Sequence, residues 1–428
     1  MSSILTNNGA MVALQTMKSI NKNLGQVQSQ ISTGKAVANA KDNAAVWAIS
    51  KTMESDVKGF KGISSSLSLG SSTIAVARSA AEQITDLLTE IKDKVVASQE
   101  ENVDRTKIQA DVSALRDQIG SIVGAAQFNG LNLLSNRQSG ATVANIVGNT
   151  GTGKGVLGSS NVDILSSLDR SASGVATSNI KVSKADLGIQ ARVAGAGTDI
   201  AATAATGAGA VAAAASGTIS IVGDTGTAVR GGNKVLAGDT YAIGGLTGIS
   251  AAVSYVARDG DSTTDIAKGL VERLNFEAKK AGVSISAEFD ASGANPGVKI
   301  TNGTSAGITT TTTVTTGGTA GGGLEILKDL DVSTNTGAEA ALSAIEGLTQ
   351  SAIQAASDFG TTQSRIDVQQ SFVSNLVDSL KAGIGSMLDA NMEEASARLQ
   401  ALQVQQQLAT QSLSIANQAP QSILSLFR

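Results

Sequence analysis

Nonpolar residues recur at every seventh position over two long stretches of the chain. The first row comprises Val46, Met53, Phe60, Leu67, Ile74, Ala81, Leu88 and Val95. The second row comprises Ile345, Ala352, Phe359, Ile366, Val373, Leu380 and Met387. A sustained seven-residue nonpolar repeat is typical of a coiled-coil seam. The pattern therefore predicts two long rod helices over about 42–99 and 336–387, with Asp42 as the N-cap of the first.

A shorter helix is predicted from about Asp104 to the Asn129-Gly130 turn signal. Its nonpolar residues follow three-and-four spacing, which places them on one helical face: Ile108, Val112, Leu115, Ile119 and Ile122. We expect this helix to fold back antiparallel on the first rod helix. The three narrow nonpolar stripes can then bury one another, so the two sequence arms meet in space.

The two ends of the chain carry weaker nonpolar rows and few charges. After Met387 the seam slips by one position, which predicts a bend. The residues expected to pack in the two terminal helices are Leu14, Met17, Leu24, Ile31, Leu388, Met392, Leu399, Leu402 and Leu413. One interpretation is a hairpin docked on the rods of the same chain. The favoured interpretation is stacking against identical copies, because Leu399–Phe427 contains no charged residue and a lone surface hairpin normally carries Lys and Glu.

Residues 191–323 have a different pattern, in which short alternating runs are separated by Gly and Asp. These runs predict strands, and a helix over 266–281 with Ser262 or Thr263 as its cap. The low-complexity flanks, 194–217 and 308–323, are expected to be linkers or edge strands. Three aspartates (Asp259, Asp261 and Asp265) suggest either a calcium loop or a turn with a helix cap. The turn is favoured, because the last loop position lacks a Glu.

These patterns predict a mainly α protein: a long coiled-coil helix bundle formed by the N- and C-terminal arms, with an inserted α+β outer domain. The expected divisions are terminal helices at 1–34 and 388–428, rod segments at 35–190 and 324–387, and the outer domain at 191–323.

Composition removes several function classes. The 428 residues include no His and no Cys, which excludes Cys/His zinc sites, His-based triads and thiol chemistry. Net charge is −4 and aromatic residues are 2%, so nucleic acid is not an expected partner. No apolar run is long enough to span a bilayer, and no secretory n-region is present, so export would not use a cleaved Sec signal. We expect no cofactor and no enzymatic activity, although a carboxylate-pair hydrolase stays formally open.

Long collinear stretches of both arms resemble bacterial flagellin, the subunit of the flagellar filament, over about two-thirds of the chain. They include "SILTNNGAMVAL", "ISTGKAVANAKDNAAVWAIS", "AAQFNGLNLL" and "LDANMEEASARLQALQVQQQLATQSLSIANQAPQSILSLF". Trp47 and the ending "SILSLFR" look most like the alphaproteobacterial type. The resemblance implies an extracellular helical homopolymer, in which other flagellins can also take part. It also implies type III export with a chaperone, and contact with the filament cap and hook-associated proteins. A hook-filament junction protein of the same superfamily is the alternative.

One departure from the family concerns innate-immune recognition. Flagellins recognised by the vertebrate Toll-like receptor carry an Arg and a Leu in the stretch that corresponds to 89–96. Here Glu90 and Lys94 stand at those places. A charge reversal in a complementary interface weakens binding. The resemblance therefore implies weak receptor activation.

Overall fold

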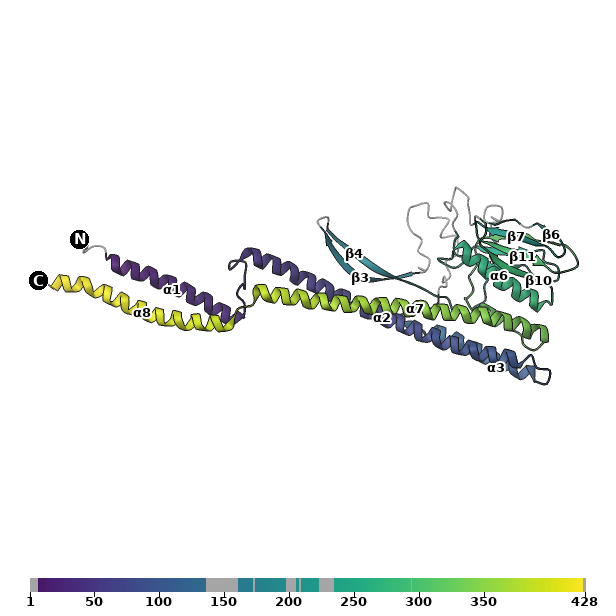
Figure 1. Ribbon diagram of the computed structural model, residues 1–428, viewed down its shortest axis with the longest axis horizontal. Coiled ribbons are helices and arrows are strands. Elements are labelled where there is room, and N and C mark those ends of the chain that lie inside the picture. Colours follow the sequence, from purple (N-terminus) through teal and green to yellow (C-terminus); the bar gives the residue numbers. More distant parts are fainter. Residues whose placement is uncertain are drawn as a thin grey trace. The chain divides into compact units, whose positions relative to one another are not determined.

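A computed structural model describes residues 7–135, 161–171, 174–197, 205–207, 209–222, 235–293 and 295–425. The chain divides into two compact units. One comprises Met1–Ser65, Ser167–Ala176 and Gln370–Arg428, and the other comprises Ser66–Ser166 and Thr177–Gln369. The longer helices are α1 (Asn8–Thr33), α2 (Ala44–Ala97), α3 (Arg105–Ala125), α6 (Thr263–Lys280), α7 (Asn335–Leu388) and α8 (Met392–Ser425) (Figure 1).

Helices α1 and α8 form an antiparallel pair in the first unit. The Asn7 side chain donates to the Ala416 carbonyl over 2.8 Å, and Gln406 donates to the Asn21 side chain over 2.9 Å. At the other end of the pair, Lys35 and Asp389 form an antiparallel bridge. Gly34 ends α1 with a φ of 70°, a left-handed conformation that suits glycine. The start of α1 therefore lies beside the C-terminal half of α8, and the helix breaks between α7 and α8 where the seam slips.

The start of α2 corrects the predicted cap. The Asn43 side chain accepts from the Val46 N–H over 3.2 Å, as an N-cap does. The Asp42 carboxylate instead accepts from the N–H groups of Ala38 and Asn39, which closes the preceding turn. The prediction of Asp42 was therefore wrong by one residue, because a second side chain of capping type follows it directly.

In the second unit, α2 runs antiparallel to both α7 and α3. Arg78 donates to Gln363 on α7 over 2.9 Å, and Ser71 contacts Asp367. On the other side, Lys94 pairs with Asp111 on α3 over 2.7 Å. Between these polar contacts lies a continuous nonpolar core from all three helices. Its residues with at most 1% exposure include Leu67, Ile74, Ile84, Leu88, Ile91, Val95, Val112, Ile119, Ile345, Phe359 and Ile366.

Short strands and one long hairpin follow α3. The hairpin of β1 (Gln127–Phe128) and β2 (Leu131–Asn132) turns at Asn129 and Gly130, both with positive φ. Strands β3 (Asn161–Ser171) and β4 (Gly174–Ser183) form a separate two-stranded sheet. Ile164 of β3 packs against Gly70 of α2, where the missing side chain makes room. Part of this hairpin is thus seated on the rod by a glycine.

The inserted domain consists of small antiparallel sheets around α6. One sheet has the order β10-β11-β7-β5, a second has β13-β8-β9, and β12 pairs with β6. The strand bounds are β5 Ala205–Gly207, β6 Ala210–Val211, β7 Ser216–Ile221, β8 Thr240–Gly244, β9 Val253–Val256, β10 Ile285–Asp290, β11 Gly297–Asn302, β12 Ile308–Thr309 and β13 Thr311–Thr315. Within the described residues, parts of both low-complexity flanks are therefore paired strands.

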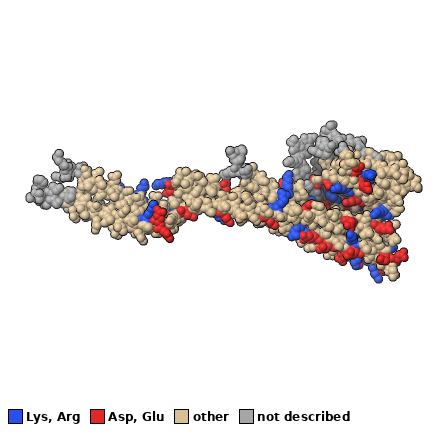
Figure 2. Space-filling model, in the orientation of Figure 1, with Lys and Arg blue, Asp and Glu red and all other residues tan. Residues whose placement is uncertain are grey.

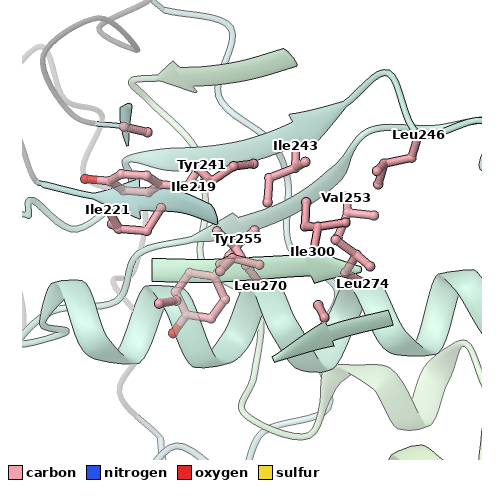
Figure 3. Close-up of a cluster of buried hydrophobic side chains, with 14 of the residues drawn as sticks. Ile219, Ile221, Tyr241, Ile243, Leu246, Val253, Tyr255, Leu270, Leu274 and Ile300 are labelled. Atoms are coloured by element: carbon pink, nitrogen blue, oxygen red, sulfur yellow. The ribbon is translucent and has the colours of Figure 1, made fainter. Parts of the chain in front are cut away.

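The core of this domain is its own. Buried residues from the strands and from α6 form one cluster, in which Tyr241, Tyr255 and Leu270 lie close together (Figure 3). Ser262 and Asp265 form a capping box at the start of α6. Asp261 accepts from the Tyr255 hydroxyl over 2.7 Å and from the Arg258 N–H. Two of the three aspartates thus serve a turn and a helix cap. No group of three or more potential metal ligands occurs in the described part of the chain.

Candidate assembly surface

The α1–α8 pair buries only part of its nonpolar side chains. The residues that close the pair are Ile20, Val27, Leu388, Ala395 and Ala409, each less than 9% exposed. Most of the residues predicted to pack here are partly buried: Met17, Leu24, Ile31, Leu399, Leu402 and Leu413. Leu14 and Met392 are 45% and 44% exposed. The small Ala395 and Ala409 are therefore more completely buried than several of the predicted leucines.

A second nonpolar stripe lies on α8 and was missed by the seam analysis. Val404, Leu408 and Ile415 are 55–68% exposed. Their spacing of four and seven residues places them on one helical face, about half a turn from Ala395, Leu402 and Ala409. The signal was present in the sequence as a nonpolar row offset from the seam. Helix α1 has a comparable set in Met11, Val12 and Leu14, all exposed.

The pair also lacks the charges that normally keep a surface helix soluble. Between Asn8 and Thr33 the only charged residues are Lys18 and Lys22, and α8 has none after Arg398. Few charged atoms therefore cover this pair in Figure 2. A groove of about 410 Å³ remains between the two helices, and it is lined by four amide side chains, by the nonpolar Val27, Ala401 and Leu402, and by Arg398. A neutral, incompletely packed helix pair with outward nonpolar stripes is suited to bury those stripes against another protein.

The rod seam residues occupy a different environment. Leu67, Ile74, Leu88, Val95, Ile345, Phe359 and Ile366 are almost completely buried, and Val373 is 1% exposed. Val46, Met53, Phe60 and Leu380 are partly buried. The middle of the seam is therefore satisfied within one chain, whereas its outer members keep some accessible surface.

The stretch 89–96 on α2 contains both buried residues, Ile91 and Val95, and residues that reach the surface. Glu90 is exposed, and the Lys94 ammonium is held by Asp111 of α3. That hydrogen bond raises the pKa of Lys94 above its ordinary value. Lys94 therefore stays positively charged at neutral pH.

In the part of the chain that the structure describes, no helix is both long and apolar enough to cross a lipid bilayer.

Long coiled-coil helices, combined with a neutral terminal pair that leaves nonpolar stripes uncovered, define a class of structural proteins that assemble with copies of themselves.

The chain belongs to the bacterial flagellin family. Residues 4–139 match the bacterial flagellin N-terminal helical region, and residues 342–427 match the C-terminal helical region. It is 34% identical to Flagellin A of Rhizobium meliloti over 440 residues, with all of both chains covered, and 33% identical to Flagellin B of the same organism. A crystal structure of Xanthomonas campestris FlgL is 14% identical, covers 78% of this chain and 99% of its own, and has a TM-score of 0.33.

Full-length similarity to flagellins identifies the chain as a subunit of the extracellular bacterial flagellar filament. This function is favoured over that of a hook-filament junction protein, because the flagellin relatives are matched over their entire length.

Proposed function

We propose that α1 and α8 are the surface through which this subunit joins identical copies in the filament. One observation carries the proposal: Val404, Leu408 and Ile415 form an exposed nonpolar stripe on the part of α8 that follows Arg398 and has no charged residue. Complete burial of one such side chain is worth about 1.5–3 kcal/mol. Three such side chains per helix, repeated in every subunit, provide a favourable nonpolar contribution to the contact.

In the same proposal the predicted residues have two roles. The terminal positions Leu14, Met17, Leu24, Ile31, Leu388, Met392, Leu399, Leu402 and Leu413 pack in the polymer core. The rod seam holds each subunit together, which the complete burial of its middle residues supports. The inserted domain has a separate core, which supports a place outside the polymer contacts. The divisions at residues 34, 190, 323 and 387 belong to this proposal.

The subunit works as a mechanical element without catalysis or a cofactor. Membership of a structural family supports this assignment. The same membership supports export through the flagellar type III apparatus with a chaperone, and contact with the filament cap and hook-associated proteins. Filaments of this chain alone, or mixed with other flagellins, are both compatible with the surface described.

The test places a charge on the α8 stripe. Leu408→Glu and Ile415→Glu should abolish growth from filament seeds, measured by sedimentation and electron microscopy, since a buried unpaired carboxylate is strongly unfavourable. Leu408→Met, which conserves volume and polarity, is the matched control and should grow normally. Normal growth of both Glu variants would refute the assignment of this surface.

We also propose that Glu90 and Lys94 weaken recognition by the vertebrate Toll-like receptor. The exposed side chain of Glu90 and the fixed position of Lys94 support this reading. Replacing both, as Glu90→Arg with Lys94→Leu, should increase activation of receptor-bearing reporter cells by about tenfold or more. A potent response to the unaltered protein would contradict it.

A further inference from the structure

Two chain segments connect the inserted domain to the rod, and they pair with each other. The entering segment (185–197) and the returning segment (316–329) are here called the neck. Val193 and Thr319 exchange both backbone hydrogen bonds, at 2.9 and 2.8 Å. Gly322 donates to Gln190 over 2.8 Å, and Leu324 donates to Gly188 over the same distance. At Gly321, Gly322 and Gly323 a Cβ atom would collide with neighbouring atoms, so only glycine allows this close approach.

Three arginines hold the neck from different elements. Arg192 of the entering segment pairs with Glu325 of the returning segment over 2.8 Å. Arg258, which lies between β9 and α6, pairs with Asp186 over 3.2 Å and donates to the carbonyls of Gly321 and Gly322. Each of these two guanidinium groups thus contacts one or both segments of the neck. The ion pair between Arg192 and Glu325 joins residues 133 positions apart in sequence.

Arg273 of α6 completes the cluster. Its side chain is 9% exposed, and it pairs with Asp329 over 2.6 Å and lies 3.6 Å from Glu325. Glu325 therefore faces two guanidiniums, while its second oxygen accepts from the Arg192 N–H over 3.1 Å. Ion pairs in such a protected position are screened little by salt, and they specify one geometry because other geometries leave charges uncompensated.

The contact between α6 and α7 contains gaps. Two cavities, of about 260 and 840 Å³, lie along this side of the domain. The smaller is lined by Arg273, Glu272 and Ser351, and the larger by Lys279, Thr336 and Glu346. Polar side chains line a large part of both cavities, so the contact between α6 and α7 is incomplete there. Phe276 of α6 is nevertheless 2% exposed and lies outside the core cluster of the inserted domain. The core cluster of the inserted domain, in turn, contains no neck residue.

We propose that the neck is a conformational lock, in which the buried arginine–carboxylate cluster centred on Glu325 holds the inserted domain in one orientation on α7. Without the cluster, the paired glycine-rich segments act as a hinge, and the domain stays folded but samples many orientations. The three arginines then add to the rigidity of the filament's outer part beside the buried nonpolar neck residues Leu324 and Leu327.

Pulsed electron paramagnetic resonance on the full-length monomer tests the lock directly. The chain has no cysteine, so Ser286→Cys on β10 and Ser357→Cys on α7, both at exposed positions, give a unique pair of spin labels. Glu325→Gln removes the central charge with little change in shape. Glu82→Gln is the matched control, because it removes an exposed ion pair with Arg78 on the rod, away from the neck. Both tyrosines lie in the domain core, so near-ultraviolet circular dichroism reports its fold.

The expected result is one narrow distance distribution in the parent and the control. In Glu325→Gln the distribution should widen by about twofold or more, as expected for a freed hinge, with the tyrosine signal retained. An Arg192→Met/Glu325→Met variant, which leaves no orphaned partner within that pair, should also widen it. An unchanged width in both variants would overturn the lock. Loss of the tyrosine signal would also overturn it, because the domain would then depend on the neck for its fold.

Discussion

Gly70 provides a sharp test of how the β3–β4 hairpin is seated on the rod. It lies in the middle of α2, where a glycine normally weakens a helix. A Cβ atom at Gly70 would lie 2.5 Å from Cδ1 of Ile164 and 2.9 Å from its Cγ2. Gly62, two turns earlier on the same helix, has open space around the equivalent position. The two glycines therefore separate helix propensity from packing.

The expected magnitudes have opposite signs. Alanine in place of glycine stabilises a helix interior by about 0.8–1 kcal/mol. Gly62→Ala should therefore stabilise α2 by nearly that amount. Overpacking against a seated side chain costs about 1–3 kcal/mol, so Gly70→Ala should range from no net change to a loss of about 2 kcal/mol. The difference between the stability changes of Gly62→Ala and Gly70→Ala therefore measures the cost of crowding Ile164.

Native-state hydrogen exchange, read separately for α2 and for β3–β4, measures these local opening free energies. A double-mutant cycle with Ile164→Val, which removes the closest atom, should recover about 0.5–1.5 kcal/mol of the Gly70→Ala loss. Equal stabilisation by Gly62→Ala and Gly70→Ala would refute the seating of Ile164 on Gly70. Absence of coupling to Ile164 would refute it as well.

Four other substitutions test further contacts. Asn302 is fully buried, and its amide donates to three backbone carbonyls; Asn302→Ala should destabilise the inserted domain by about 2–4 kcal/mol, measured by tyrosine circular dichroism in urea, with filament growth unaffected. Burial raises the pKa of Tyr255 well above its ordinary value, so its contribution to stability is complete below about pH 10 and is lost as pH rises through the raised pKa. Tyr255→Phe should remove this alkaline loss in urea titrations at several pH values; an identical loss in the variant would exclude Tyr255 as its source. Asn43→Ala should increase amide exchange in the first turn of α2 about fivefold, from about 1 kcal/mol of lost capping; Asp42→Ala should act on residues 38–39 instead, and the reverse pattern would restore Asp42 as the cap.

The helices of the two arms could be predicted well, because a seven-residue repeat of nonpolar positions is visible in the local sequence. The seven-residue rows gave helices over 42–99 and 336–387, and the structure has them at Ala44–Ala97 and Asn335–Leu388. The break after Met387 also coincides with the end of α7. Cap identity was less accessible, because Asp42 and Asn43 are both capping residues and only the backbone geometry decides between them.

The inserted domain and the neck could be predicted only in part. Alternation indicated most strands, and Ser262 was correctly offered as the cap of α6. Strand order was not accessible, since β7 pairs with β11 across 75 or more residues. The pairing of Arg192 with Glu325 gave no local signal either. In the terminal helices, large nonpolar residues were expected to form the contact. Ala395 and Ala409 close the α1–α8 pair instead, because small side chains allow the helices to approach closely.

The geometry of the neck has a consequence for the whole insert. Val193 and Thr319 already form a hydrogen-bonded pair, which is the closing pair that a two-residue hairpin requires. Replacing residues 194–318 by Asn-Gly should therefore close the neck without moving the rod. The ion pair between Arg192 and Glu325 is kept. Asp186 and Asp329 lose their partners Arg258 and Arg273, but removal of the insert also exposes both carboxylates to water. Because the proposed assembly stripe lies on α1 and α8, the shortened chain should still extend filament seeds under the electron microscope. A shortened chain that keeps its helical circular dichroism but cannot extend seeds would show that the insert takes part in assembly.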